Sequence, residues 1–418
     1  MNDIISRAPR PCFEPYQPFA QSQLDDPYPV LSRARAEQPV FYVPELDFWV
    51  VTRYEDVNRI YGQPALFSNA AVLTPRVDVP DEIRREFGDR QLPLAHQLVM
   101  TDPPQHTRLK KLMTPAFMPS RINAREAWIR QYTNTLIDGF IADRSADLVG
   151  QYAVRIPPAV IGKIVGAPER DAQQFAGWVD DIFTLTGAWD VPEDERAAAW
   201  RGVFAFEDYI RQLIADRRHH PQDDLTTDFI QAVTDDGAPA MSDIEVLHNV
   251  VNVAAAGADT TGVLISQLLH LLLTHPEQLQ AILADRSLVA NAVHEAMRFR
   301  PPVRGLMRKT SSDVNVGGIA IPAGSMVFIS LASANRDSAV FDKAEQFDVR
   351  RDGAFKNLGF GSRTHACIGV NLARLEARIA VETLFERLPD LVLVEGQATM
   401  QYRANLMLPA FKSLRVRW

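Results

Sequence analysis

Cys367 lies in a segment whose residue types suit a metal-binding thiolate. Residues 360–369 place Gly361, His365 and Gly369 around this cysteine, and a helical pattern follows them. A cysteine at a loop-to-helix junction meets free backbone N–H groups and the positive end of the helix dipole, which both favour the thiolate. Glycines let the backbone approach the sulfur closely. For a lone cysteine, however, a structural buried thiol is the commoner explanation.

A second chemical signal lies in residues 256–261, inside a long apolar pattern. Asp259 and Thr260 set an acid beside an alcohol, a pair that can carry protons if it is buried. Gly257 weakens the helix, and a threonine can bond a carbonyl one turn back, so a local opening that admits oxygen and water is expected. The alternative is a packing glycine with satisfied polar neighbours.

Basic and imidazole side chains form a third group. His106 and Lys110 are four residues apart and share one face of a predicted helix, while Arg308 lies in a β-rich region. They could bind carboxylates through charge-assisted hydrogen bonds, or they could be solvated surface groups. Glu295 and Arg298 are three apart on a helix and can pair, for which a structural role is predicted.

The elements that must position these residues are readable from caps and periodicity. Ser242 and Glu245 form a capping box that begins a helix running to about Thr274, where His275-Pro276 ends it. Residues 40–43 and 48–52 predict a β-hairpin, and residues 314–329 alternate as strands. Residues 69–97 and 186–195 show weak periodicity and are predicted to be long surface loops.

Bulk properties exclude several classes of protein. The 418 residues carry a formal net charge of −8, which disfavours nucleic-acid binding, because such binding depends on neutralised phosphates. The two cysteines, Cys12 and Cys367, cannot build a disulfide framework or a zinc ribbon, and a reducing cytoplasm fits them best. The first thirty residues contain no apolar stretch, so no signal peptide or membrane anchor is expected there.

Taken together, these motifs resemble the cytochrome P450 family, in the family's order and over nearly the whole chain. Matches to its cysteine loop are Phe360, Gly361, His365, Cys367 and Gly369. The Glu295–Arg298 pair, Arg308, the His106 segment and the Asp259-Thr260 motif match further family elements. Two positions depart from the pattern: Arg363 replaces a glycine, and Lys110 replaces the more usual arginine.

The resemblance implies a mainly α fold with small β regions, in which a long central helix lies over the haem and the cysteine loop lies on its proximal side. We expect one domain over 1–418, with a β-rich subregion at about 38–55 and 310–332 plus C-terminal strands. The implied cofactor is haem b, with Cys367 as the iron ligand and with His106, Lys110, Arg308 and His365 as further haem-binding residues. Asp259 and Thr260 are the implied catalytic acid and alcohol.

The implied activity is a monooxygenase that inserts one oxygen atom from O₂ into a small, largely apolar substrate. Family position places six residues at the substrate: Val253, Ala256, Val303, Arg304, Leu306 and Leu406. Arg304 could bind a substrate carboxylate or point away. A peroxide-using peroxygenase and a non-catalytic haem protein remain alternatives.

The chain ends soon after the last family element, so we expect a separate ferredoxin to deliver the electrons. Candidate contacts for this acidic partner are Lys111, Lys356 and Arg363. The resemblance further implies a monomer in the cytoplasm, without nucleic-acid or membrane partners.

Overall fold

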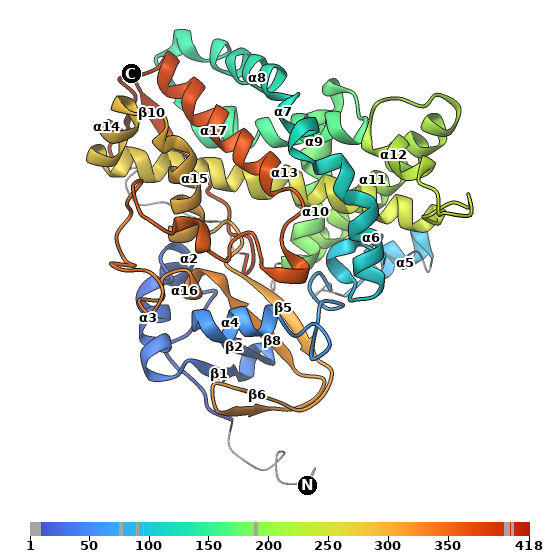
Figure 1. Cartoon of the computed structure of the whole chain (residues 1–418), viewed down its shortest axis with the longest axis horizontal. Helices are drawn as coiled ribbons and strands as arrows, with labels where there is room; N and C mark the ends of the chain where they lie inside the picture. The colour runs from blue at the N-terminus through green and yellow to red at the C-terminus, as the bar shows by residue number, and fades with distance from the viewer. Residues whose placement is uncertain are drawn as a thin grey trace.

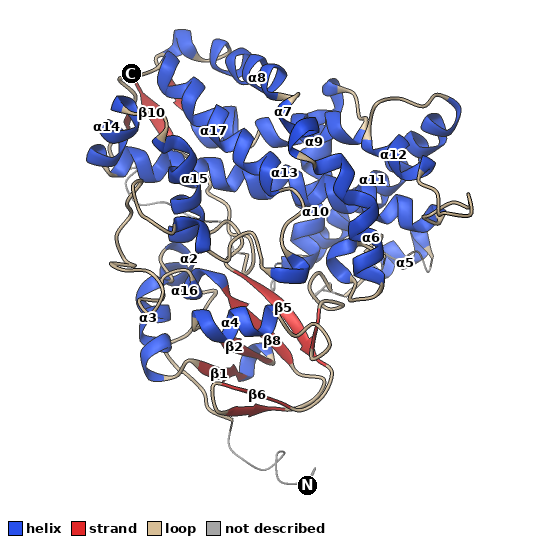
Figure 2. Ribbon diagram, viewed as in Figure 1, coloured by secondary structure: helices blue, strands red, loops and turns tan. Residues whose placement is uncertain are grey.

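Helices form most of the molecule, and a β-rich region lies to one side of them (Figures 1 and 2). The computed structural model describes residues 10–74, 78–88, 90, 92–94, 96–187, 191–396, 402 and 405–418. A mainly α chain with small sheets was predicted, and this part of the prediction is confirmed.

The β-rich region is built on a five-stranded sheet of order β1-β2-β8-β5-β3. Only β2 and β8 pair in parallel; the other neighbours are antiparallel. Two smaller sheets join β4, β10 and β9, and β6 with β7. The strands are β1 (Val40–Val43), β2 (Phe48–Val51), β3 (Phe67–Ser68), β4 (Ser145–Asp147), β5 (Gly305–Thr310), β6 (Val314–Val316), β7 (Ile319–Ile321), β8 (Met326–Ser330), β9 (Val392–Leu393) and β10 (Arg415–Arg417).

The helical region surrounds one long helix, α13, in the middle of the molecule (Figure 1). The helices are α2 (Gln21–Asp25), α3 (Tyr28–Glu37), α4 (Tyr54–Tyr61), α5 (Asp81–Phe87), α6 (Gln105–Met113), α7 (Pro119–Asn123), α8 (Glu126–Asp138), α9 (Ile156–Val165), α10 (Ala172–Gly187), α11 (Glu193–His219), α12 (Leu225–Gln231), α13 (Asp243–Thr274), α14 (Pro276–Ala284), α15 (Leu288–Phe299), α16 (Leu331–Ala334) and α17 (Val370–Arg387).

Helix α13 begins as its capping box predicts. The Ser242 side chain accepts a hydrogen bond from the Glu245 backbone, and Glu245 reaches back to the Ser242 backbone. The helix ends at Thr274, before His275 and Pro276. Its caps therefore define both ends of the element that carries the Asp259-Thr260 pair.

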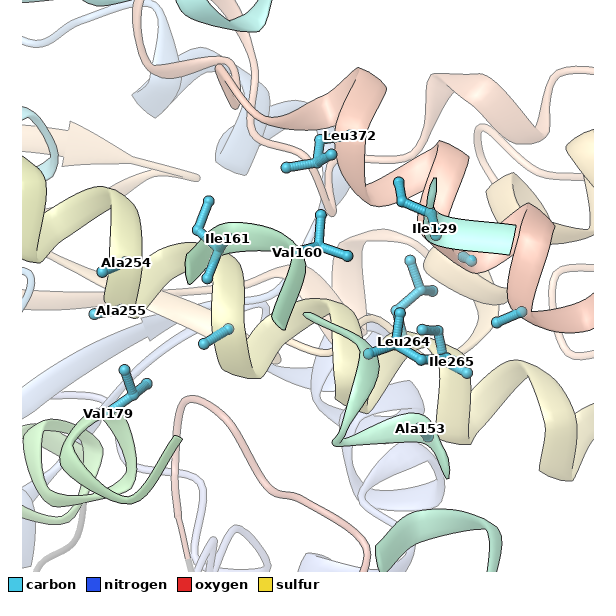
Figure 3. Close-up of a cluster of buried hydrophobic side chains, with 14 of the residues drawn as sticks. Ile129, Ala153, Val160, Ile161, Val179, Ala254, Ala255, Leu264, Ile265 and Leu372 are labelled. Atoms are coloured by element: carbon cyan, nitrogen blue, oxygen red, sulfur yellow. The ribbon is translucent and has the colours of Figure 1, made fainter. Parts of the chain in front are cut away.

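The core around α13 is apolar on nearly every side. Val160 and Ile161 of α9, Val179 of α10, Ile129 of α8 and Leu372 of α17 lie around α13 (Figure 3). Among the described residues, α13 is the one helix long and apolar enough to cross a membrane, but 72% of its most apolar window is buried inside the protein. This burial identifies α13 as a core helix.

Two loop predictions need correction. Residues 69–97 include α5, because Pro80 allows a helix to begin, acidic Asp81 and Glu82 suit its first turn, and Ile83 is buried beneath it. In the segment 186–195, residues 186–187 end α10 and residues 193–195 begin α11, while 188–190 lie outside the described residues. The predicted hairpin and the C-terminal strands are confirmed.

Candidate active site

A largely apolar cavity lies between α13 and the cysteine loop. Its volume, counting the part that is open to solvent, is about 920 Å³. The residues that line it are Leu98, Met113, Phe117, Ile161, Asn252, Val253, Ala256, Gly257, Thr260, Thr261, Leu264, Met297, Pro302, Val303, Gly359, Phe360, Cys367, Ile368, Gly369, Leu372 and Ala373. The cavity thus brings together Cys367 and Thr260, which are more than a hundred residues apart in the chain.

Cys367 opens onto this cavity from the loop before α17. Its backbone N–H donates to the Phe360 carbonyl at 2.7 Å, which closes the loop beneath the sulfur. The surrounding protein raises the pKa of the thiol by desolvation, while the Gly369 backbone N–H and the Lys110 ammonium lower it by less, although the sulfur has exposed surface in the cavity. The amide predicted to favour the thiolate is therefore present.

The cysteine loop contains two residues with left-handed backbone. At Gly361, φ is +69°, and a Cβ would stand 2.6 Å from the His365 carbonyl oxygen, so this position requires glycine. Arg363 has φ of 54° although it is not glycine. Glycine adopts this conformation freely, whereas an arginine in it costs about 1 kcal/mol.

Thr260 and Asp259 have different surroundings on α13. Thr260 lines the cavity, and its Oγ1 donates to the Ala256 carbonyl one turn back at 2.8 Å, as predicted. Asp259 is half-buried and is not part of the cavity wall. Helix α13 continues through Gly257 without a break, and the Ile161 side chain packs against the bare face of this glycine.

Three of the predicted haem-binding residues form a buried cluster with unfilled hydrogen-bonding capacity. Arg308 is 2% exposed, and its only hydrogen bond in the described structure is to the Met307 carbonyl. The rings of His106 and His365 lie 4.1 Å apart, and burial lowers their pKa values to about 4 and about 3. His106 Nδ1 and His365 Nε2 are buried without a partner.

This cluster fits the propionates of haem b. A fully buried guanidinium needs an anion or several acceptors, because an unpaired buried charge is costly. The two imidazoles are neutral, so each can donate one N–H. The donors around Arg308 and the thiol of Cys367 therefore match the two ends that a haem presents, its carboxylates and its iron.

Lys110 contacts the cysteine loop, which was not predicted. Its Nζ donates to the carbonyls of Thr364 at 2.7 Å and Ala366 at 3.0 Å, on either side of His365. The ammonium thus ties α6 to the cysteine loop. Since lysine has three donors, a contact of Lys110 with a propionate stays a prediction.

The Glu295–Arg298 pair is structural, as predicted. Both side chains are fully buried and joined by two hydrogen bonds of 2.7 and 2.8 Å. Arg298 also donates to three backbone carbonyls, and Arg351 donates to Glu295. A pair with so many partners fixes α15 to the segment that leads to the cysteine loop.

Of the six residues predicted to face a substrate, three line the cavity: Val253, Ala256 and Val303. Arg304 points away from it, over the Tyr402 ring at 4.7 Å, and lines a smaller cavity together with Leu406. Val303 and Arg304, although adjacent in the chain, therefore line different cavities. Leu306 packs with the sheet cluster that surrounds Trp49.

The sequence analysis missed Asn252, a polar residue in the cavity wall. It lies one turn before Ala256 and two turns before Thr260 on the same face of α13. This spacing, in an otherwise apolar stretch, was the signal that could have found it.

Comparison with known proteins agrees with the site. The model of the family "Cytochrome P450" matches residues 70–409. A vitamin D(3) 25-hydroxylase of Pseudonocardia autotrophica is 32% identical over 96% of both chains. The cytochrome P450 monooxygenase PikC of Streptomyces venezuelae is 34% identical over 94% of this chain and 91% of its own.

Solved structures show the same likeness. The cytochrome P450 CREJ in complex with (4-ethylphenyl) dihydrogen phosphate superposes with a TM-score of 0.89 at 31% identity, over 96% of this chain and 99% of that one. The family model, these relatives and the cysteine loop agree, and the chain therefore belongs to the cytochrome P450 family of haem-thiolate enzymes.

Proposed function

We propose that this P450 inserts one oxygen atom from O₂ into a small, largely apolar substrate, using electrons from a ferredoxin. The observation that carries the proposal is that Cys367 and Thr260 line the same largely apolar cavity. The similar proteins include a vitamin D(3) 25-hydroxylase and a 6-deoxyerythronolide B hydroxylase, which supports hydroxylation.

The protein would hold the haem from two sides. Cys367 supplies the thiolate to the iron, while Arg308, His106 and His365 bind the propionates through the donors described above. Bound in this way, the haem supplies reductive activation of O₂. The apolar residues Leu98, Val253 and Val303 exclude water from the substrate's side of the cavity.

Thr260 and Asp259 would take part in proton transfer. The Thr260 hydroxyl is held by the Ala256 carbonyl beside the cavity, so its oxygen can accept a hydrogen bond there. Asp259, half-buried on the neighbouring face, can relay protons toward Thr260 from outside the cavity. This division of roles follows from which of the two side chains reaches the cavity.

The first test is the absorption spectrum of the dithionite-reduced protein with carbon monoxide, beside Cys367→Ser. We expect a strongly red-shifted Soret band in the wild type that the variant loses. A folded, haem-loaded wild type without this band would remove the proposal.

A second test separates the alternatives. Turnover with a ferredoxin and its reductase, and not with hydrogen peroxide alone, supports the monooxygenase. Efficient turnover with peroxide alone supports a peroxygenase, and the absence of all turnover supports a non-catalytic haem protein.

Electron delivery would use the surface beside the cysteine loop. The exposed cations proposed for this surface are Lys111, Lys356 and Arg363. Phe355, which directly precedes Lys356 in the chain, is an exposed aromatic side chain. An acidic ferredoxin complements such cations. We further propose a monomer in the cytoplasm, acting on small molecules rather than on nucleic acids or membranes.

A further inference from the structure

Asn252 is a polar side chain without a protein partner in an apolar wall. It is 7% exposed, and no hydrogen bond of its amide is found in the described structure. Asn252 is not among the residues whose polar side-chain atoms are fully buried without a partner, so its amide has surface in the cavity that it lines. A group bound in the cavity can therefore pair with this amide.

A neighbouring asparagine shows what a structural role looks like on the same helix. Asn249 accepts from the Leu98 backbone at 2.8 Å and donates to the carbonyls of His96 and Glu245. These bonds fasten the segment before α6 to α13. Asn252, three residues later, has none of them, so holding the fold together does not explain it.

The other polar groups of the cavity wall lie at or beside the proposed reacting residues. Asn252, Thr260, Thr261 and Cys367 are the polar or thiol side chains in the lining given above. Thr260 has the proton-transfer role proposed above, Thr261 is its neighbour on α13, and Cys367 is the proposed iron ligand. Asn252 is thus the polar group of the wall that lies apart from Thr260 and can recognise a distant part of the substrate.

The position of Asn252 on α13 sets its distance from Thr260, beside which the substrate would react. Asn252, Ala256 and Thr260 follow one another at intervals of four along α13, and the cavity is continuous along them. Eight residues of helix correspond to about 12 Å along the axis. A substrate that reacts beside Thr260 and reaches Asn252 must extend about two helix turns.

We infer that Asn252 determines substrate specificity by binding a hydroxyl, carbonyl or amide oxygen at the far end of an extended, otherwise apolar substrate. This inference rests on the proposed monooxygenase function and narrows its substrate class. An all-hydrocarbon ligand would displace water from the amide and leave it unpaired, so Asn252 also disfavours such ligands.

The test uses probes that are fixed to the iron at one end. N-alkylimidazoles, from butyl to dodecyl, are compared with the same compounds bearing a terminal hydroxyl, and dissociation constants are read from the Soret shift. For the wild type, we expect the hydroxyl to improve binding about tenfold at the chain length that reaches Asn252, and little at shorter lengths.

Three variants complete the experiment. Asn252→Leu, of similar volume, should abolish the preference for the hydroxyl, and Asn252→Gln should restore it with a different optimal length. Val253→Ala, the matched control in the same wall, should change both probe series equally.

Two results would overturn the inference: a hydroxyl preference that survives in Asn252→Leu, or its absence at every length in the wild type. If the wild type lacks the thiolate carbon monoxide band, the proposed function fails instead, and this spectrum tells the two failures apart.

Discussion

Arg304 and Arg308 differ in what surrounds their guanidinium groups, although only three residues separate them. Arg304 donates to the Gln23 carbonyl and stacks on Tyr402, outside the main cavity. Arg308 is buried near two histidines, each of which has one buried ring nitrogen without a partner. The first position suits packing, and the second suits a bound carboxylate.

We therefore predict that Arg308→Leu weakens haem retention, whereas Arg304→Leu does not. Losing charge-assisted hydrogen bonds to a propionate should speed haem loss about tenfold to a hundredfold. Transfer of haem to apomyoglobin measures this rate. Equal rates for the two variants would show that Arg308 does not bind the haem.

Asp181 of α10 predicts a pH dependence of stability. Burial, with a smaller contribution from Asp180, raises the pKa of this carboxyl from 3.8 to about 7. Between these values the folded chain holds a proton that the unfolded chain releases, so the free energy of unfolding falls as the pH rises through this window.

Asp181→Asn should remove this dependence. Because the side chain is half-exposed and screened by solvent, we expect the variant to gain only about 1 kcal/mol relative to wild type between pH 5 and pH 8. Urea unfolding at both pH values measures the difference. A gain of the same size at each pH would contradict the assignment.

At the scale of elements, the stability of α13 depends on the hydrogen bonds of its first turn. Ser242 and Glu245 satisfy two backbone N–H groups there, and Glu245 also accepts from Gln105 of α6 at 2.6 Å. The cap thus joins the start of α13 to the helix that carries His106.

Ser242→Ala should lower the free energy of unfolding by about 1 kcal/mol. Ser242→Thr keeps the hydroxyl and serves as the control, with a smaller loss expected. Chemical denaturation of the haem-bound protein provides the measurement, and equal losses in both variants would argue against a capping effect.

The whole molecule sets how electrons reach the haem. Lys111 follows α6 residues that touch the cysteine loop, and Lys356 is exposed in the segment before that loop. Lys111 and Lys356 are thus exposed cations on two segments that are far apart in the chain.

Lys111→Glu with Lys356→Glu should slow reduction by an acidic ferredoxin about tenfold at low salt, and the effect should fade at high salt. Reduction by dithionite, a small diffusing reductant, should be unchanged. Stopped-flow measurement of both reactions checks the prediction, and unaltered reduction by ferredoxin would place the docking surface elsewhere.

The sequence alone determined much of the site, because several of its signals are local. The capping box of α13, the hairpin of β1 and β2, and the cysteine loop each depend on residues within a span of twelve positions. Such short-range patterns can be recognised in the sequence without knowledge of the fold. That the chain is one domain stays a prediction.

Only the tertiary structure decided which side chains meet. It turned Arg304 away from the cavity, placed Lys110 on the carbonyls of the cysteine loop, and left Asn252 facing the cavity without a partner. Each outcome depends on elements distant in sequence, and a side chain's partners follow from packing rather than from local spacing. The physical reason is that burial and hydrogen bonding are properties of the assembled core.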